Sequence, residues 1–251
     1  MQAIISCKDL HKSFGSQHVL RGLSLDIEPD SVTVIIGRSG GGKSVLLKHI
    51  VGLMKPDSGE VRIEGQDITG LSVRDMADVR RGFGLLFQEG ALFDSMTVED
   101  NVAFPLREHS GLRNKEILDI VARKLSSVGL ADAGHKMPAE LSGGMRKRVG
   151  LARAIALDPK IVLFDEPTSG LDPVMSAAIN ELILRTRDEF GATCVVISHD
   201  IQATMAIADT IYMLYEGQII ARGTPEEIRA NQNPVVRQFI EGRADGPIGL
   251  E

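Results

Sequence analysis

The sequence contains no tryptophan, and aromatic residues make up only 4% of its 251 residues. Proteins that bind single-stranded nucleic acid stack the bases on aromatic side chains, and this chain has few of them. Its 28 basic and 34 acidic residues give a net charge of -6, so no overall positive field attracts a phosphate backbone. We therefore expect no nucleic acid among its partners.

Long apolar runs and a disulfide framework are also missing. No stretch approaches the roughly 18 apolar residues that a membrane-spanning helix needs, so we expect any membrane role to come through a partner. Charged residues from Lys8 onward interrupt the N-terminal segment, and we expect no signal peptide. The two cysteines, Cys7 and Cys194, lie in apolar strand-like segments, which favours buried thiols over a disulfide.

Short apolar strands alternate with helical patterns along most of the chain. Strands are predicted at residues 3–10, 19–27, 31–36, 60–63, 84–87, 160–164 and 193–198. Helices are predicted at residues 43–53, 114–128, 151–157 and 175–189. This alternation indicates an α/β fold with a mostly parallel sheet, into which the region 90–157 is inserted as helices.

A glycine-rich turn follows the β-branched strand 31–36. Its residues, GRSGGGKS from Gly37 to Ser44, match the P-loop pattern G-x-x-x-x-G-K-[ST]. Glycines allow a concave backbone whose N–H groups face anionic phosphates, and the next helix points its positive end at the same charge. We interpret Lys43 as a ligand of the β- and γ-phosphates and Ser44 as a Mg²⁺ ligand. The remaining residues of the phosphate cradle are Gly37, Ser39, Gly40, Gly41 and Gly42. The turn therefore predicts a site for ATP and Mg²⁺.

Two adjacent carboxylates end the apolar strand 160–164. At the carboxyl end of a parallel strand, Asp165 is suited to hold Mg²⁺, and Glu166 to orient or deprotonate the water that attacks the γ-phosphate. His199 follows the strand 193–198, and we interpret it as a donor to the γ-phosphate. The other histidines show no metal-ligand spacing and receive no role: His11, His18, His49, His109 and His135.

The segment Leu141-Ser142-Gly143-Gly144-Met145 resembles the LSGGQ signature of ABC ATPases, with Met145 where glutamine is usual. In that family the signature loop binds the γ-phosphate held by another subunit, so two ATP molecules lie between two chains arranged head to tail. The resemblance thus implies a homodimer in which Ser142, Gly143 and Gly144 contact nucleotide. Because Met145 lies beyond this turn, we expect hydrolysis to be unaffected.

Further motifs of the family appear in the family's order. Phe14 resembles the aromatic residue that stacks on adenine, with Val19 as a second contact. Gln88 resembles the Q-loop glutamine, which contacts Mg²⁺ and the attacking water and leads into the helical insertion. The segment Ser169-Gly170-Leu171-Asp172 is similar to the D-loop, which crosses the dimer interface.

The resemblance implies a P-loop ABC ATPase fold. This fold has a RecA-like mixed, mostly parallel sheet core, an N-terminal antiparallel β subdomain and an inserted α-helical subdomain. Residues 1–240 would form one domain, with the core and antiparallel parts at about 1–88 and 158–240 and the helical subdomain at about 89–157. Residues 241–251 would form a C-terminal tail.

Two segments narrow the resemblance to one group within the family. FQEGALF at 87–93 and NVAFPLRE at 101–108 are very similar to the ATPases of the Mla (Mce-associated) phospholipid-transport systems, the MlaF group. This similarity implies an MlaE-like permease and an MlaD-like Mce-domain protein as partners, with a STAS-domain protein as a further candidate. It also implies a place on the cytoplasmic face of the bacterial inner membrane, and a tail that can embrace the neighbouring ATPase subunit.

Three other readings compete with this one. The chain could energise an ABC transporter for another cargo, or act on ribosomes or DNA as a soluble ABC ATPase. The latter class needs a second cassette, a long coiled coil or a basic patch, and none is visible. A non-hydrolysing regulatory module is disfavoured because Lys43, Glu166 and His199 are all present. The basic run 146–148 is interpreted as a solvated helix surface, since consecutive residues fan around a helix.

Overall fold

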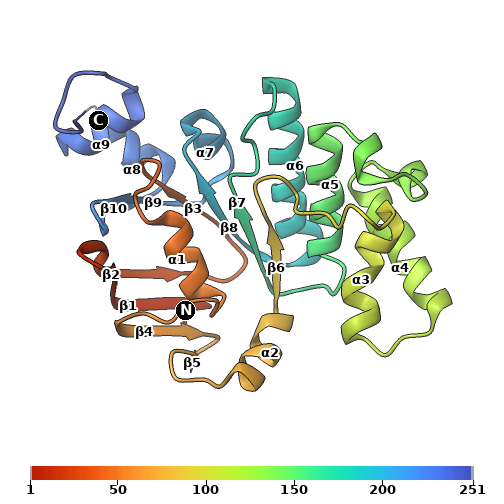
Figure 1. Cartoon of the computed structure of the whole chain (residues 1–251). Coiled ribbons are helices and arrows are strands. Elements are labelled where there is room, and N and C mark those ends of the chain that lie inside the picture. Colours follow the sequence, from red (N-terminus) through yellow and green to blue (C-terminus); the bar gives the residue numbers. More distant parts are fainter. Residues whose placement is uncertain (1, 250–251) are drawn as a thin grey trace. The chain divides into compact units, whose positions relative to one another are not determined.

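The computed structural model describes residues 2–249, which form two compact units (Figure 1). The first unit contains the chain up to Met76 and from Val196 onward, and the second contains Ala77–Val195. Helix α2 (Val73–Arg81) carries the chain from the first unit to the second, and strand β8 (Thr193–Ser198) carries it back.

An antiparallel sheet in the first unit has the strand order β2-β1-β4-β5. The strands are β1 (Ile5–Phe14), β2 (Gln17–Ile27), β4 (Ser58–Ile63) and β5 (Gln66–Asp67). In the β1–β2 register Ile5 faces Ile27 and Phe14 faces Gln17. The strands are longer than predicted, and their hairpin places Phe14 beside the connecting turn.

The first unit also contains strands in the order β10-β9-β3-β8. Strand β3 (Val32–Ile36) is buried throughout and runs parallel to β9 (Thr210–Tyr215), whereas β10 (Gln218–Gly223) is antiparallel to β9. The helices of this unit are α1 (Lys43–Ile50), α7 (Ile201–Ile207), α8 (Pro225–Ala230) and α9 (Pro234–Glu241). The core strand and the helix after it therefore form where the sequence predicts them.

The second unit contains strands in the order β8-β7-β6, and β6 (Phe83–Leu86) runs parallel to β7 (Ile161–Asp165). Its helices are α3 (Val98–His109), α4 (Asn114–Ser127), α5 (Gly143–Ala154) and α6 (Pro173–Phe190). Short 3-10 turns lie at Ala131–Ala133 and Pro138–Glu140. Helices α3, α4 and α5 contact one another, and α5 also contacts β6.

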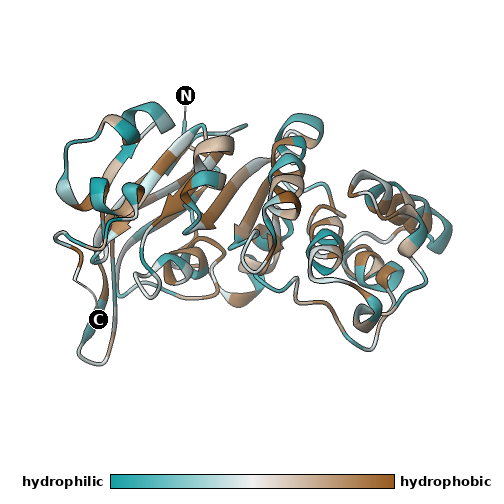
Figure 2. Ribbon diagram, turned by 90° about the horizontal axis from the view of Figure 1, so that it is seen from above, coloured by the Kyte–Doolittle hydropathy of each residue, from teal (hydrophilic) through white to brown (hydrophobic). Residues whose placement is uncertain are grey.

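Apolar residues are concentrated in the strands, and hydrophilic residues on the helices and loops (Figure 2). Strand β8 is buried along its whole length, and β7 up to Phe164. Cys7 and Cys194 are both buried and free, which confirms the prediction of buried thiols. Within residues 2–249, no helix is long and apolar enough to cross a membrane.

Two helices of the second unit differ from the sequence-based expectation. Within the region 90–157, which is expected to be helical, the sequence pattern does not locate α3, because Pro105 lies inside this helix and obscures its period. Helix α5 was predicted only at 151–157, whereas it begins at Gly143 directly after the signature residue Ser142. The Ser142 hydroxyl accepts a hydrogen bond from the Met145 N–H, as an N-cap residue should.

A buried glutamine holds the C-terminal segment against α9. The Gln238 Nε2 donates to the carbonyls of Arg243, Ala244 and Ile248, and its Oε1 accepts from the Ile248 N–H at 2.7 Å. Both Gln238 and Ile248 are buried. The tail predicted at 241–251 therefore folds back on its own chain as far as Ile248. Its last two residues lie outside the described part of the chain, as does residue 1 of the predicted domain.

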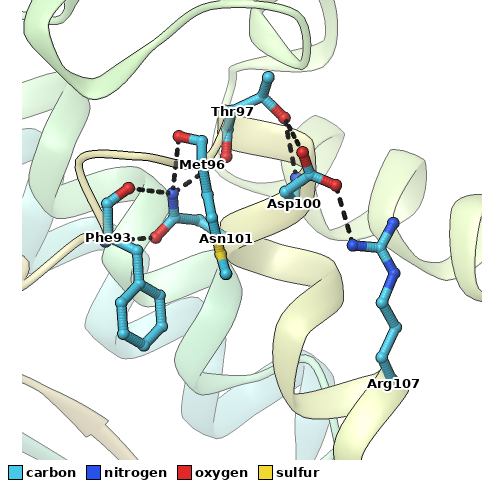
Figure 3. A network of polar contacts seen from close by, with 6 residues as sticks. All are labelled: Phe93, Met96, Thr97, Asp100, Asn101 and Arg107. Atoms are coloured by element: carbon cyan, nitrogen blue, oxygen red, sulfur yellow. Dashed lines mark hydrogen bonds and ion pairs between the residues drawn. The ribbon is translucent and has the colours of Figure 1, made fainter.

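A second buried amide fixes the loop that follows β6 (Figure 3). Asn101 of α3 has no exposed surface. Its Oδ1 accepts from the Phe93 N–H at 2.8 Å, and its Nδ2 donates to the carbonyls of Phe93, Met96 and Thr97 at 3.1, 3.2 and 3.0 Å. On the same helix, Asp100 accepts from Thr97 and pairs with Arg107. The loop 93–97 therefore has a specified conformation.

We predict that Asn101→Ala lowers the free energy of unfolding by about 1–3 kcal/mol, because it leaves buried backbone groups of the loop without partners. Urea unfolding measures the change. Arg107→Ala is the matched control, since it removes only an exposed ion pair on the same helix and should cost no more than about 1 kcal/mol. Equal effects of the two substitutions would contradict this account of the loop.

Candidate nucleotide site

The P-loop connects β3 to α1 within the first unit. Gly37, Gly40 and Gly42 have positive φ angles of 155°, 73° and 99°, a region that disfavours other residues. The Gly41 N–H donates to the Arg38 carbonyl, which closes the turn. Gly42 is the N-cap of α1, so the loop runs directly into the positive end of this helix. The turn that the sequence predicts to bind phosphates therefore lies at the N-terminus of a helix.

Lys43 lies inside this loop. Its ammonium is buried and donates to the carbonyls of Gly37 at 2.7 Å and Arg38 at 2.9 Å. Ser44, the next residue on α1, is exposed, and so is Ser39 within the loop. The loop therefore carries a fixed positive charge and a hydroxyl at one end of α1, where a Mg²⁺-bound triphosphate needs them.

Val19 packs against the P-loop, and Phe14 is exposed at the end of β1. A Cβ added at Gly42 would lie 3.2 Å from Val19 Cγ1, so Val19 packs against the P-loop backbone. Phe14 is 47% exposed, with the Lys12 ammonium 5.7 Å from its ring centre. A cavity of about 340 Å³ borders the other side of the loop, lined by Arg38, Ser39, Gly40 and Gly41 together with Gln17 and residues 214–216. An exposed ring on a hairpin is available for stacking on a base.

His199 is exposed at the end of β8 in the first unit. The next residue, Asp200, begins α7 as its N-cap and accepts from the Ala203 N–H at 3.0 Å, and its own N–H donates to the Ser198 hydroxyl at 2.9 Å. These local bonds fix the strand-to-helix turn that carries His199.

In the second unit, β7 ends in the two predicted carboxylates. Asp165 is the last residue of β7, and Glu166 follows it; both are half-buried. Glu166 has a φ of 50°, which is uncommon for a residue with a side chain. Its carbonyl accepts from the Ser169 N–H at 3.2 Å. The backbone thus turns sharply at the proposed catalytic position.

The other predicted residues of the second unit lie near one another. Gln88 is exposed, and its Nε2 donates to the Ser169 hydroxyl at 3.3 Å, which brings the Q-loop to the D-loop. A Cβ added at Gly144 would lie 2.5 Å from Met175 Cε, and one at Gly143 would lie 3.9 Å from Leu171. The signature turn therefore packs against the D-loop and the start of α6.

Asp172 has a structural task that the sequence did not indicate. It is the N-cap of α6, and its Oδ1 accepts from the N–H groups of Val174 and Met175 at 2.9 and 3.0 Å. Its side chain is nevertheless exposed, as are Ser142 and Gly143.

The interpretation of the run 146–148 as a solvated surface is wrong for Lys147. Its side chain is buried, and the ammonium donates to the carbonyls of Pro167 at 2.8 Å and Ser169 at 2.6 Å, with Glu166 O at 3.4 Å. Burial lowers the pKa of Lys147, and the nearby carboxylates of Glu166 and Glu89 act in the opposite direction. The basic run 146–148 does not show in sequence that its middle residue is buried, because that burial depends on tertiary packing.

A cavity of about 610 Å³ in the second unit borders many of these residues. Its lining includes Gln88, Gly143, Lys147, Ser169 and Leu171, together with Glu89, Ala91, Leu92, Asp94, Pro138, Ala139, Arg146 and Gly170. The lining thus combines residues that follow β6 with residues from the start of α5 and from the D-loop.

The residues present fit a magnesium nucleotide. The first unit provides a glycine-rich turn, a buried ammonium and a helix N-terminus, which match the charge of phosphates. The second provides two carboxylates at the end of a parallel strand, and an exposed glutamine after the neighbouring strand. A P-loop and a later strand that ends in such carboxylates are typical of proteins that hydrolyse nucleoside triphosphates.

Comparison with known proteins places the chain within this class. A family model described as ABC transporter matches residues 20–169. The chain therefore belongs to the ABC transporter family. It is an ATP hydrolase, and its cofactors are ATP and Mg²⁺.

Curated relatives match over the whole chain. A probable ribonucleotide transport ATP-binding protein, mkl, of Mycobacterium leprae is 46% identical over 250 residues, covering 100% of this chain and 72% of the relative. The intermembrane phospholipid transport system ATP-binding protein MlaF of Haemophilus influenzae is 44% identical, covering 98% of this chain and 94% of the relative. MlaF of Escherichia coli K12 is 42% identical, with 98% and 91% covered.

Solved structures of ABC cassettes share the fold, which confirms the predicted fold class. The structure of cbiO1 from Clostridium perfringens, part of the ABC transporter complex cbiONQ, has a TM-score of 0.85 at 30% identity, covering 95% of this chain and 94% of that one. The ATP-binding cassette MJ0796, in a dimeric post-hydrolysis state bound to ADP and Pi, has a TM-score of 0.81 at 30% identity, with 88% and 98% covered.

We predict that Gly37→Ala lowers the free energy of unfolding by about 3 kcal/mol or more, because a Cβ there would lie 2.3 Å from the Leu214 carbonyl oxygen and force the backbone apart. Urea unfolding tests this. Gly15→Ala is the matched control, with positive φ but open space around the new Cβ, and should cost only about 1–2 kcal/mol. If Gly37→Ala were no more costly than the control, the close approach of β9 would not explain this glycine.

Proposed function

We propose that this chain is the ATPase subunit of a bacterial phospholipid transporter, acting as a head-to-tail homodimer on the cytoplasmic face of the inner membrane. The observation that carries this proposal is the similarity to MlaF phospholipid-transport proteins along almost the entire length of both sequences. The dimeric cassettes of similar fold support the proposed assembly.

In this proposal, each predicted site residue has a task at a nucleotide that is bound between two copies of the chain. The loop from Gly37 to Gly42 and the Lys43 ammonium bind the phosphates of ATP, while Phe14 stacks on adenine beside Val19. Ser44, Gln88 and Asp165 would hold Mg²⁺, which neutralises phosphate charge when bound. Glu166 receives a proton from the water that attacks the γ-phosphorus, and His199 donates to a γ-phosphate oxygen. Ser142, Gly143, Gly144 and Asp172 of a second copy complete the nucleotide pocket.

Domain organisation follows the same proposal. Residues 1–240 act as one ABC ATPase domain, in which the part at about 89–157 is the helical subdomain that faces the permease. The closed dimer binds ATP more tightly than ADP. Only such a difference in affinity can drive a conformational change in a partner protein. The partners of the proposed complex are an MlaE-like permease and an MlaD-like Mce-domain protein, with a STAS-domain protein as an additional candidate.

Ribonucleotide is the second candidate cargo, because the mycobacterial relatives carry that description at 46% identity. The phospholipid assignment is preferred since the chain covers more of the MlaF proteins, 94% against 72%. The test reconstitutes the chain with its membrane partners in vesicles and measures ATP-dependent movement of a labelled phospholipid and of labelled cytidine monophosphate. ATP-dependent phospholipid movement supports the proposal, and ATP-dependent movement of the cytidine monophosphate without phospholipid movement replaces it with the alternative.

We predict that Glu166→Gln lowers kcat for ATP hydrolysis by at least about a hundredfold while Mg-ATP binding persists, because the amide cannot accept the proton of the attacking water. The variant should also accumulate as an ATP-bound dimer in size-exclusion chromatography. Steady-state assays and calorimetry measure the two effects. Glu108→Gln, an exposed carboxylate on α3, is the control and should hydrolyse ATP as the parent does. Undiminished turnover by Glu166→Gln would remove Glu166 from the catalytic step.

We predict that the double substitution Leu92→Ser and Phe93→Ser releases the chain from its permease, because these apolar side chains lie at the start of the loop 93–97, which Asn101 holds in one conformation. Phe93 is 42% exposed although its ring packs at a tilt against Phe104, with ring centres 4.9 Å apart. Co-purification from detergent-solubilised membranes measures the association. Leu112→Ser, another exposed apolar residue of the second unit, is the control. Full retention of the permease by the double variant would show that this surface is not the contact.

A further inference from the structure

The buried ammonium of Lys147 has no task in the proposed reaction, yet it occupies the turn that carries Glu166. Its partners at Glu166, Pro167 and Ser169 are all backbone carbonyls within one short segment. An ammonium has three donors and no acceptor, so these three carbonyls account for its full hydrogen-bonding capacity. Burying an ammonium costs free energy unless its hydrogen bonds are made. The three carbonyls are therefore held in positions that accept from Lys147.

The turn from Glu166 to Ser169, which Lys147 binds, needs contacts from other parts of the chain to keep its conformation. Glu166 is in the left-handed region at φ 50°, and backbone in such regions costs about 1–3 kcal/mol and persists where surrounding contacts impose it. The Glu166 carbonyl accepts from the Ser169 N–H as well as from Lys147, and the Leu171 N–H donates to the Thr168 carbonyl. Lys147 thus joins the backbone of this turn to another element, while Gln88 binds the Ser169 side chain.

That element is α5, which carries the signature turn at its first residues. About two turns further along, a Cβ at Gly150 would lie 3.1 Å from the Gly90 backbone, so the helix lies directly on the segment that follows Gln88. Arg153 donates to the carbonyls of Gly90 and Ala91, both at 2.8 Å. Helix α5 therefore contacts the D-loop through Lys147 and the Q-loop through Gly150 and Arg153.

We propose that Lys147 is a positioning residue of the ATPase: it fixes the Glu166 backbone and the D-loop to α5, so that the signature turn and the hydrolytic carboxylate of one chain move together. This inference rests on the proposed function, in which the signature turn contacts one nucleotide and Glu166 acts on the other. A displacement of α5 by the nucleotide of the partner subunit is then passed directly to Glu166.

The test compares Lys147→Met, which keeps the length of the side chain but removes the donors, with Lys147→Arg, which keeps charge and donors. In the full-length protein, Lys147→Met should lower kcat for ATP hydrolysis by about tenfold to a hundredfold, the usual effect of misplacing a catalytic group by about 1 Å. The Kd for Mg-ATP should stay near the parent value because the P-loop is untouched. Lys147→Arg should recover a substantial part of kcat. Lys115→Met, an exposed lysine on α4, is the matched control and should leave kcat unchanged.

Hydrogen exchange separates positioning from packing. Lys147→Met should increase exchange at the amides of Ser169 and Leu171, whose hydrogen bonds lie within the held turn, while the rest of the protein exchanges as before. A residue needed only for packing would lower the melting temperature without changing kcat below the transition. If Lys147→Met does not fold, the same measurements are made on Lys147→Gln.

The outcomes distinguish the two proposals. Absence of Mg-ATP hydrolysis by the parent protein, or full turnover by Glu166→Gln, would overturn the proposed function and this inference with it. Parental hydrolysis that depends on Glu166, together with an unchanged kcat in Lys147→Met, would overturn the positioning role alone.

Discussion

The close approach of backbone to backbone at the end of β3 is the constraint on which the site depends. Gly37 lies so near the Leu214 carbonyl that no side chain fits between them, and the loop can then turn back over the start of α1. In this arrangement Lys43 lies inside the loop with its ammonium bound to two of the loop's own carbonyls. A phosphate site therefore exists because a buried parallel strand, a left-handed turn and a helix end follow one another in the chain.

The same logic explains how much of the fold and site the sequence could predict. The P-loop is one continuous stretch of sequence, and so is the Asp165–Glu166 pair. In each case the residue types and the adjacent sequence are enough to predict a position at the end of a strand. The bounds of α3 could not be predicted because Pro105 interrupts its helical pattern. The start of α5 could not be predicted because glycines at 143 and 144 are weak helix formers. Lys147 could not be assigned from sequence, because the carbonyls that surround it come from a segment twenty residues away.

Within the second unit, polar side chains from helices repeatedly fix loops by binding their carbonyls. Asn101 does so for the loop 93–97, Arg153 for Gly90 and Ala91, and Lys147 for the turn after β7. Helices are stiff and loops are not, so a loop bound at several carbonyls takes on the rigidity of the helix. A catalytic carboxylate and a surface for a membrane partner both need such rigidity, since their geometry must be reproduced in every cycle.

The amide of Gln238, which binds the segment 243–248, bears on how the end of the chain could reach another copy. The Arg243 N–H also donates to the Gln238 carbonyl at 3.1 Å, so the start of the segment is tied to α9 by main-chain as well as side-chain bonds. The segment can reach another copy only when these bonds open together, and the frequency of that local opening limits how fast such a contact forms.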